Sequence, residues 1–329
     1  MYMSEIELIL AAPRGYCAGV DRAVETVEQA LKLQGAPVYV RKQIVHNLHV
    51  VADLETRGAI FVDDVTEVPE GATVVFSAHG VAPTVHTDAE QRALTVIDAT
   101  CPLVTKVHNE AKRYDQGGYH ILLIGHAEHE EVVGTMGEAP GAMTLVEHAA
   151  EVASLPDFPE GQPLAYLTQT TLSVDETRSI IEALTQRFPW IESPEKGDIC
   201  YATSNRQAAV KELAKVTELV LVIGSANSSN SCRLVEVARD AGVDSYLIED
   251  ESEIDPTWIG DRTKIGITSG ASAPERLVLG VIEWFRDRSD GITVSELETV
   301  HEDVAFQLPR PIRRALAMVA VEPVTKDLS

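Results

Sequence analysis

The chain has 329 residues, of which 45% are hydrophobic and 24% charged, so it can bury a large core and divide into two or three domains. Its formal charge of −24 at pH 7 argues against a nucleic-acid partner, because binding a polyanion needs clustered Lys and Arg. The N-terminus lacks the basic start of a signal peptide, and no apolar run approaches the roughly 18 residues of a membrane span. We expect a cytoplasmic protein that binds neither membrane nor nucleic acid, and four cysteines fit its reducing environment.

Helix-period segments follow three of the four cysteines. The first is predicted over residues 21–35, with Asp21 as its N-cap, and the second over residues 102–117, with Pro102 in a first helical position. The third begins near Ser204. Each of these helices therefore starts shortly after a cysteine.

Short β-rich runs lie between the predicted helices, and most stop at a polar cluster. The clusters are residues 45–47, 77–80, 125–131, 168–171, 224–230 and 268–272. Strands that alternate with helices predict α/β units with mainly parallel pairing. Ligands of such units collect at the carboxyl ends of the strands, where these clusters lie.

The order of cysteine, helix, strand, polar end, helix, strand and polar end recurs three times. This repeat predicts three similar α/β units: residues 1–98 with Cys17, 99–195 with Cys101, and 196–288 with Cys200. Residues 289–329 lose the pattern, and we expect them to form a C-terminal extension that is partly flexible.

Cys17, Cys101 and Cys200 each stand at a break before a helix, and a helix N-terminus favours the thiolate that binds metal. Three thiolates from three units can converge on one centre. If that centre is an iron-sulfur cluster, three protein ligands leave one iron open to a substrate. Cys232 lacks this setting, and we interpret it as a structural thiol. The alternative for any one of these cysteines is a free thiol that packs in the core as a small hydrophobic residue and has no chemical role.

Histidines end several of the β-rich runs: His46, His79, His126 and His129. An imidazole at a strand end can donate a hydrogen bond to phosphate or exchange protons near neutral pH. Glu131, two residues past His129, is a candidate proton donor if it is partly buried, although most such runs of glutamates are solvated.

Residues 225–231, rich in Ser and Asn, follow an apolar run and precede a helix. Hydroxyls, amides and a helix N-terminus together form a cradle for an anion. Residues 268–274 repeat this arrangement, so the two segments predict a shared anion site.

Five motifs resemble, in the same order, those of the 4-hydroxy-3-methylbut-2-enyl diphosphate reductase (IspH/LytB) family. They are PRGYCAGV at 13–20, SAHG at 77–80, DATCPLV at 98–104, TQTTLS at 168–173 and NSSNS at 227–231. The resemblance implies an oxygen-sensitive oxidoreductase at the last step of the methylerythritol phosphate route to isoprenoids. It would reductively remove the allylic hydroxyl of 4-hydroxy-3-methylbut-2-enyl diphosphate and give isopentenyl and dimethylallyl diphosphates. The implied fold has three α/β units in pseudo-threefold arrangement around a central iron-sulfur site, in agreement with the repeat.

The resemblance also implies roles for particular residues. Cys17, Cys101 and Cys200 match the ligands of one 4Fe-4S cluster, which becomes 3Fe-4S if oxidised, and the open iron would bind the substrate hydroxyl. Glu131, Thr170 and His129 match catalytic positions, with Glu131 as the proton donor. The substrate-contacting positions match His46, His79, His129, Thr170, Ser228, Ser229, Asn230 and Ser272. The electrons would come from a ferredoxin or flavodoxin.

One position departs from the family pattern. The family usually has Pro between the residues that match His129 and Glu131, whereas this chain has Glu130. Because Pro fixes φ, its loss predicts a looser loop before Glu131.

Two other classes remain open from the sequence. An iron-sulfur sensor or electron carrier without a substrate would leave the His and Ser/Asn clusters idle. Alternatively, the thiols would hold a structural zinc, with a hydrolase site at the strand ends.

Overall fold

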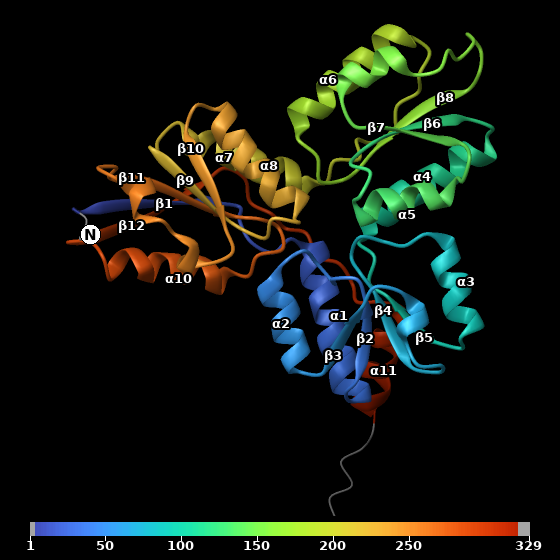
Figure 1. Ribbon diagram of the computed structural model, residues 1–329. Coiled ribbons are helices and arrows are strands. Elements are labelled where there is room, and N and C mark those ends of the chain that lie inside the picture. Colours follow the sequence, from blue (N-terminus) through green and yellow to red (C-terminus); the bar gives the residue numbers. More distant parts are fainter. Residues whose placement is uncertain (1–3, 322–329) are drawn as a thin grey trace, which may run out of the picture.

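The structure is a computed structural model that describes residues 4–321, with side chains up to residue 319, and its strands form three separate sheets (Figure 1). Every pairing between named strands in this part of the chain is parallel. Helices lie on both faces of each sheet, so the prediction of three α/β units is confirmed.

The first unit contains the sheet β3-β2-β4-β5. Its strands are β2 (Val38–Arg41), β3 (Ala59–Val62), β4 (Thr73–Phe76) and β5 (Thr95–Asp98), and its helices are α1 (Ala18–Gln34), α2 (Leu48–Thr56) and α3 (Pro83–Gln91), with a 3-10 turn at Val65–Glu67. Val38 and Val40 pack into one apolar cluster with α1 and α2, while Tyr39 packs into another with Val65. This alternation shows that both faces of the sheet are covered.

The second unit contains the sheet β7-β6-β8. Its strands are β6 (His120–Ile124), β7 (Met143–Val146) and β8 (Leu164–Thr168), and its helices are α4 (Pro102–Gln116), α5 (Glu130–Glu138) and α6 (Val174–Arg187), with a 3-10 segment at Ala149–Ser154. Along β6, Ile121 and Leu123 face the cluster that contains α4 and α5, and Leu122 and Ile124 face the cluster that contains α6. These are the continuous apolar strands of a buried parallel sheet.

The third unit contains the sheet β10-β9-β11-β1-β12. Its strands are β1 (Ile6–Ala12), β9 (Leu219–Ile223), β10 (Asp244–Ile248), β11 (Lys264–Ser269) and β12 (Ile292–Glu298). Its helices are α7 (Tyr201–Ala214), α8 (Ser229–Asp240), α9 (Pro256–Ile259) and α10 (Glu275–Arg286), with a 3-10 turn at Glu251–Glu253.

Strand β1 lies in the third sheet, although the sequence division assigned residues 6–12 to the first unit. It runs between β11 and β12, with pairs from Ile6↔Ile292 to Ala12↔Glu298. The strand is apolar at six of its seven positions, IELILAA, and Leu8 and Ala11 are fully buried. Such a strand is stable only inside a sheet covered on both faces, and neighbours in a parallel sheet need not be neighbours along the chain.

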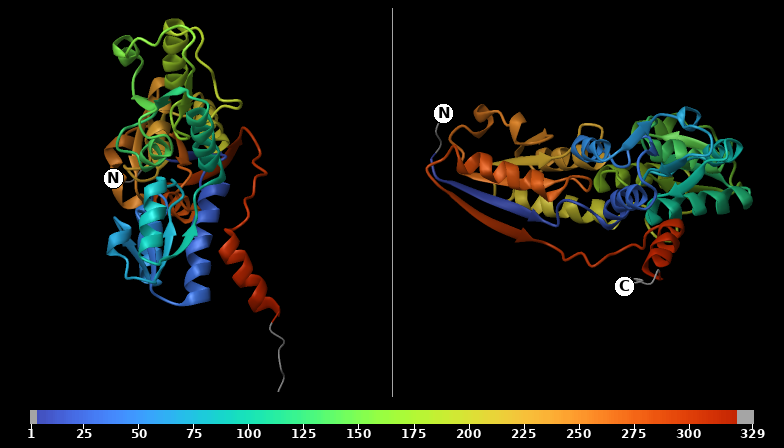
Figure 2. Two further views of the ribbon diagram at one scale, coloured as in Figure 1. Left: turned by 90° about the vertical axis from the view of Figure 1, so that its right-hand side faces the viewer. Right: turned by 90° about the horizontal axis from the view of Figure 1, so that it is seen from below.

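The C-terminal extension is ordered through residue 321. After β12, residues 299–309 cross to the first unit without regular structure, and α11 (Arg310–Val321) follows (Figure 2). Ile312 of α11 is buried in the apolar cluster of α1 and β2. The predicted flexibility of residues 322–329 falls outside the described residues. No helix in residues 4–321 is long and apolar enough to cross a membrane.

Replacement of Leu221 by Ala is expected to lower the free energy of unfolding by about 2–5 kcal/mol, because it leaves a cavity beside a fully buried central strand. Urea unfolding of the purified chain measures this change. The control is Leu279→Ala on α10, whose side chain is 55% exposed, with an expected change within about 0.5 kcal/mol. Equal losses in the two variants would contradict this account of the core.

Candidate active site

The three units meet around one cavity of about 100 Å³. Its wall contains every residue to which the family resemblance gave a role in catalysis, substrate binding or cluster binding. They are Cys17, His46, His79, Cys101, His129, Glu131, Thr170, Cys200, Ser228, Ser229, Asn230 and Ser272. The structure thus brings the whole predicted set together, and the role of each member stays a prediction.

Each of the three cysteines in the cavity is the N-cap of a helix: Cys17 of α1, Cys101 of α4 and Cys200 of α7. Two of these helices start earlier than predicted, at Ala18 rather than Asp21 and at Tyr201 rather than Ser204, because the cysteine itself takes the capping position. Three helix N-termini therefore point their partial positive charge at one cavity.

Burial opposes the thiolate form that the sequence analysis expected at these helix starts. Burial, with a smaller contribution from neighbouring thiols, raises the pKa of Cys101 to about 12 and that of Cys200 to about 11. Hydrogen bonds from the helix starts lower the two pKa values by less. These thiols ionise at neutral pH only when a positive centre lies beside them.

Packing around the thiols is close. A methyl group on Gly19 would lie 2.7 Å from the Sγ of Cys101 and 3.8 Å from the Sγ of Cys17, so only glycine fits between the two units here. In the described residues, no three His, Cys, Asp or Glu side chains are spaced to bind a single metal ion. A multinuclear centre whose metal atoms each bind one thiol fits three separated cysteines better than one ion does.

Glu131 and Thr170 form a buried pair beside the thiols. The Thr170 backbone N–H donates to Oε1 of Glu131 at 2.7 Å, and the Thr170 hydroxyl donates to Oε2 at 2.9 Å. Burial raises the pKa of Glu131 to about 7, and the two hydrogen bonds from Thr170 oppose that shift. The carboxyl group is therefore poised to hold and release a proton near neutral pH.

Three histidines form a cluster on the cavity wall. The rings of His46 and His79 stack with centroids 4.1 Å apart, and the ring of His129 stands edge-on to both. Burial lowers the pKa of His46 to about 4 and that of His129 to about 3, and it lowers the pKa of His79 well below its ordinary value. All three rings are neutral at pH 7 and can each donate one hydrogen bond.

The N-terminus of α8 faces the same cavity. Its N-cap is Ser228, whose side chain accepts from the N–H of Ser231, and Ser229 and Asn230 form the first turn. Oδ1 of Asn230 accepts from the N–H of Ala271, which joins this helix start to the segment of Ser272. In the described part of the chain, no Lys or Arg lines the cavity, so an anion there depends on helix N–H groups, hydroxyls and imidazoles.

Comparisons with known proteins assign the chain to a family. A family model described as "LytB protein" matches residues 8–286. The 4-hydroxy-3-methylbut-2-enyl diphosphate reductase of Acidothermus cellulolyticus is 58% identical, over 97% of this chain and 94% of its own length. The protein with that name from Corynebacterium diphtheriae is 57% identical, over 94% of this chain and 92% of its own length.

The chain belongs to the LytB family.

A solved structure agrees with this assignment. The E-1-hydroxy-2-methyl-but-2-enyl-4-diphosphate reductase from Plasmodium falciparum superposes with a TM-score of 0.92 at 38% identity. The match covers 96% of this chain and 99% of that protein. The resemblance drawn from the sequence motifs is thereby confirmed.

Glu130, which departs from the family pattern, helps to hold the start of α5 in place. It is the first residue of the helix, and its carboxylate lies 3.3 Å from an Nη of Arg41 and 3.7 Å from the Nζ of Lys42. His129 is the N-cap, and its Nδ1 accepts from the N–H of Glu131. Ion pairs to the first unit thus anchor the loop that the sequence analysis expected to be looser.

Cys232, interpreted from the sequence as a structural thiol, and the candidate His126 both lie outside the cavity. Cys232 is on the outer side of α8, where its Sγ contacts the carbonyl of Ala226. His126 contacts the guanidinium of Arg233 through Nε2 at 2.9 Å.

Several further residues complete the wall, and the sequence patterns did not single them out. The Oγ1 of Thr203 lies 3.1 Å from the Sγ of Cys200, and the hydroxyl of Tyr201 accepts from the N–H of Ala18. Helical spacing after Cys200 was a usable signal for Thr203. Phe306, which also lines the cavity, stands in a polar segment with no periodic pattern, so the sequence offered no signal for it.

The free energy of unfolding of the wild-type chain, relative to that of Glu131→Gln, is expected to fall as the pH rises from about 4.5 to about 7. In this window the unfolded chain releases the Glu131 proton while the folded chain retains it, so ionisation favours the unfolded state. Below about pH 4.5 and above about pH 7, the difference in the free energy of unfolding between the two chains does not depend on pH. Denaturant unfolding at pH values across the window measures it, and a pH-independent difference would contradict the raised pKa.

Proposed function

We propose that this chain reductively removes the allylic hydroxyl of 4-hydroxy-3-methylbut-2-enyl diphosphate and forms isopentenyl and dimethylallyl diphosphates, the last step of the non-mevalonate pathway. One observation carries the proposal: a single cavity combines three cysteines at helix N-cap positions, a buried carboxyl with a pKa of about 7, and an anion cradle. The names and near-complete overlap of the relatives support it.

The reaction sets the requirements for the site. The C–O bond of the substrate breaks, two electrons enter, one proton joins the departing oxygen to form water, and a second proton joins carbon. The site must therefore supply electrons, supply protons and hold a diphosphate. Apart from its three thiols, no side chain in the cavity wall can give up electrons, and a redox group held by those thiols could deliver them.

Cys17, Cys101 and Cys200 are the residues that would hold this group, which we propose is one 4Fe-4S cluster, or 3Fe-4S in oxidised protein. The donor set fits: three thiols in one cavity, each at a helix N-terminus that favours negative sulfur. When bound, the cluster would supply the electrons singly and an iron without a cysteine ligand.

Glu131 is the proposed proton donor. Its carboxyl is held by both hydrogen bonds of Thr170 and lies near enough to Cys200 to raise the pKa of that thiol. Thr170 fixes the orientation of the carboxyl, and its hydroxyl can turn its hydrogen bond toward a substrate hydroxyl. We place both residues at the reacting end of the substrate, with His129 at the start of the same helix.

The diphosphate is assigned to the other side of the cavity. His46, His79 and His129 would donate imidazole N–H groups, and Ser228, Ser229, Asn230 and Ser272 would supply hydroxyls, an amide and helix N–H groups. Because the rings start neutral, a bound anion raises their pKa values and strengthens the contact.

The two alternatives left by the sequence receive less support. A structural zinc needs ligands grouped around one ion, and the described residues contain no such group of three. An electron carrier needs no anion cradle or proton donor beside its redox group.

All four cysteines are free of disulfides, which supports the proposed cytoplasmic location.

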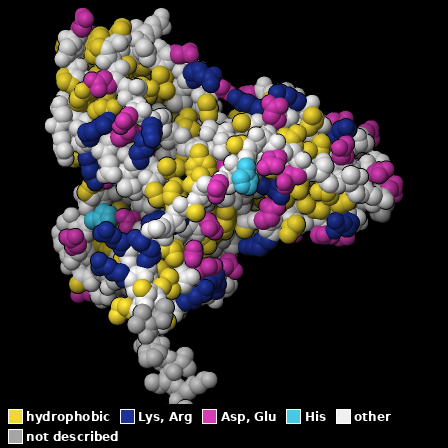
Figure 3. Space-filling model, turned by 180° about the vertical axis from the view of Figure 1, so that it is seen from behind, with side chains coloured by type: hydrophobic (Ala, Val, Ile, Leu, Met, Phe, Trp, Pro, Cys, Tyr) yellow, Lys and Arg dark blue, Asp and Glu magenta, His cyan; other side chains and the backbone are white. Residues whose placement is uncertain are grey.

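We also propose an acidic ferredoxin or flavodoxin as the electron donor. Arg310, Arg313 and Arg314 lie on one exposed face of α11, and among described residues none has an acidic side chain within the 4.0 Å of an ion pair. Figure 3 shows Lys and Arg side chains gathered on this face of the first unit. Arg310 is only four positions after Phe306 of the cavity wall, so this patch offers an acidic protein a local attraction near the site.

Anaerobically purified protein is expected to contain iron and acid-labile sulfide and to consume 4-hydroxy-3-methylbut-2-enyl diphosphate with a dithionite-reduced dye. Glu131→Gln is expected to lower turnover by about 100-fold or more, because a general acid is lost, while the visible absorbance of the cluster stays unchanged. The control is Glu128→Gln, an exposed acid of the same run.

Different outcomes separate the parts of this proposal. Colourless protein that binds zinc would refute the cluster. Protein with a cluster but no consumption of the diphosphate would refute the enzyme and favour the carrier. An unchanged rate in Glu131→Gln would remove that residue from proton transfer.

The triple variant R310Q/R313Q/R314Q is expected to raise the KM for a reduced protein donor by about three- to thirtyfold at low salt. The reason is that it removes three exposed charges that would each contact the acidic donor. Activity with the small dye should not change, and the effect should vanish at high salt. The control R178Q/K215Q/R286Q removes the same charge from three other helix surfaces. Equal KM changes in both variants would reject the patch.

A further inference from the structure

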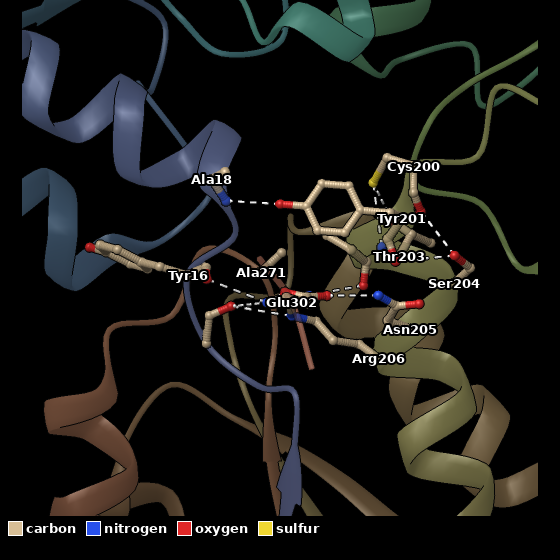
Figure 4. Close-up of polar contacts among 12 residues, drawn as sticks. Tyr16, Ala18, Cys200, Tyr201, Thr203, Ser204, Asn205, Arg206, Ala271 and Glu302 are labelled. Atoms are coloured by element: carbon tan, nitrogen blue, oxygen red, sulfur yellow. Dashed lines mark hydrogen bonds and ion pairs between the residues drawn. The ribbon is translucent and has the colours of Figure 1, made fainter. Parts of the chain in front are cut away.

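Arg206 is the largest fully buried side chain of the described residues, and it joins two of the thiol-bearing segments (Figure 4). It lies on α7, the helix that Cys200 caps, and its Nη1 donates to the carbonyl of Ala202. Its Nη2 donates at 2.7 Å to the carbonyl of Gly15 and at 3.4 Å to that of Tyr16, directly before Cys17. One guanidinium thus fixes the backbone beside two thiols.

The charge of Arg206 is balanced from the C-terminal extension. Glu302 contacts it with both carboxylate oxygens, the shortest distance being 3.1 Å to Nη1, and Oε1 of Glu302 also accepts from the amide of Asn205 (Figure 4). Glu302 belongs to residues 299–309, the irregular segment between β12 and α11, which we call the C-terminal strap. A buried guanidinium needs such a partner, because unpaired charge is costly in the interior.

A second arginine attaches the C-terminal strap beside the third thiol. Arg22 of α1 donates from Nε to the carbonyl of Gln307 at 2.8 Å. Its Nη1 donates to the carbonyls of Ala99 and Thr100, directly before Cys101, at 2.9 and 3.0 Å. Through Arg206 and Arg22, the strap is therefore bonded to the backbone next to all three cysteines.

The C-terminal strap also supplies part of the cavity wall. Phe306, between the two attachment points, lines the cavity with the three cysteines. The family model ends at residue 286, so Glu302 and Phe306 lie outside the part of the chain that it matches. The site is incomplete without this segment.

We propose that Glu302 is a positioning residue that, through Arg206, keeps the C-terminal strap closed over the thiol cavity and keeps Phe306 between the thiols and solvent. Only the iron measurement in the test below depends on the proposed function, because it needs the proposed cluster. The position of the C-terminal strap can be measured in any purified form of the full chain.

The test compares full-length wild-type protein, purified anaerobically, with Glu302→Ala, Glu302→Gln and Asp303→Asn. Asp303 is the exposed neighbour of Glu302, so its variant removes the same charge one residue away. The first measurement is the rate of chymotrypsin cleavage after Phe306, identified by mass spectrometry. The second is the rate at which a strong iron chelator removes visible absorbance.

Glu302→Ala is expected to accelerate both rates about tenfold or more, because loss of the partner of a buried guanidinium raises the population of the open strap. Glu302→Gln, whose amide oxygen still accepts from Arg206, should fall between wild type and Glu302→Ala. Asp303→Asn should match wild type. Phe306→Ala leaves the ion pair intact but removes the cleavage site, so it is measured by iron loss only, which it should accelerate.

Wild-type rates in folded Glu302→Ala, or equal acceleration in Asp303→Asn, would overturn the proposal. If a melting curve shows that Glu302→Ala does not fold, Phe306→Ala decides, and iron loss from it at the wild-type rate would overturn the proposal. If wild-type protein contains no iron, the proposed function fails, while the cleavage rates still decide whether Glu302 holds the strap.

Discussion

Burial of one cavity between three units sets the charge of an acid, three histidines and two cysteines that face it. The same removal from water raises the pKa of Glu131, lowers the pKa values of the histidines and raises those of Cys101 and Cys200. Each group is thereby moved toward its neutral form. The field in the cavity then comes mainly from helix N-termini, which favour anions. A chain of charge −24 can therefore hold anionic sulfur and diphosphate without a Lys or Arg among the residues that line the cavity.

The fold produces this field by repetition. In a parallel α/β unit all strands end, and all following helices begin, on the same side of the sheet. Three units that turn this side inward place the starts of α1, α4, α5, α7 and α8 around one point. A cysteine in the N-cap position of one helix per unit therefore lies at the central cavity because of the fold alone.

The sequence was sufficient for features that depend on local pattern. Strand ends, helix segments and the polar side chains between them follow from periodicity, and with the family motifs they located the three cysteines, the three histidines and Glu131 of the cavity, but not Tyr201, Thr203 or Phe306. Contacts between segments far apart in the sequence were harder to predict. Nothing local in residues 6–12 distinguishes the third sheet from the first, and the N-cap role of Cys17 was hidden by the better capping residue Asp21. Arg206, Glu302 and Phe306 act through contacts between segments nearly 100 to 200 residues apart, which one sequence without periodicity does not reveal.

The place of β1 in the third sheet has a consequence for how the chain is made. Its partners, β11 and β12, follow all the other strands of the described residues, so β1 is synthesised well before them and is among the last strands to be paired. The first and second sheets contain only strands that are synthesised in between, and they can form while β1 waits. Throughout that interval an apolar strand has both edges unpaired, which invites aggregation. Synthesis of the third unit ends this exposure, and the completed sheet then fixes the loop that carries Cys17.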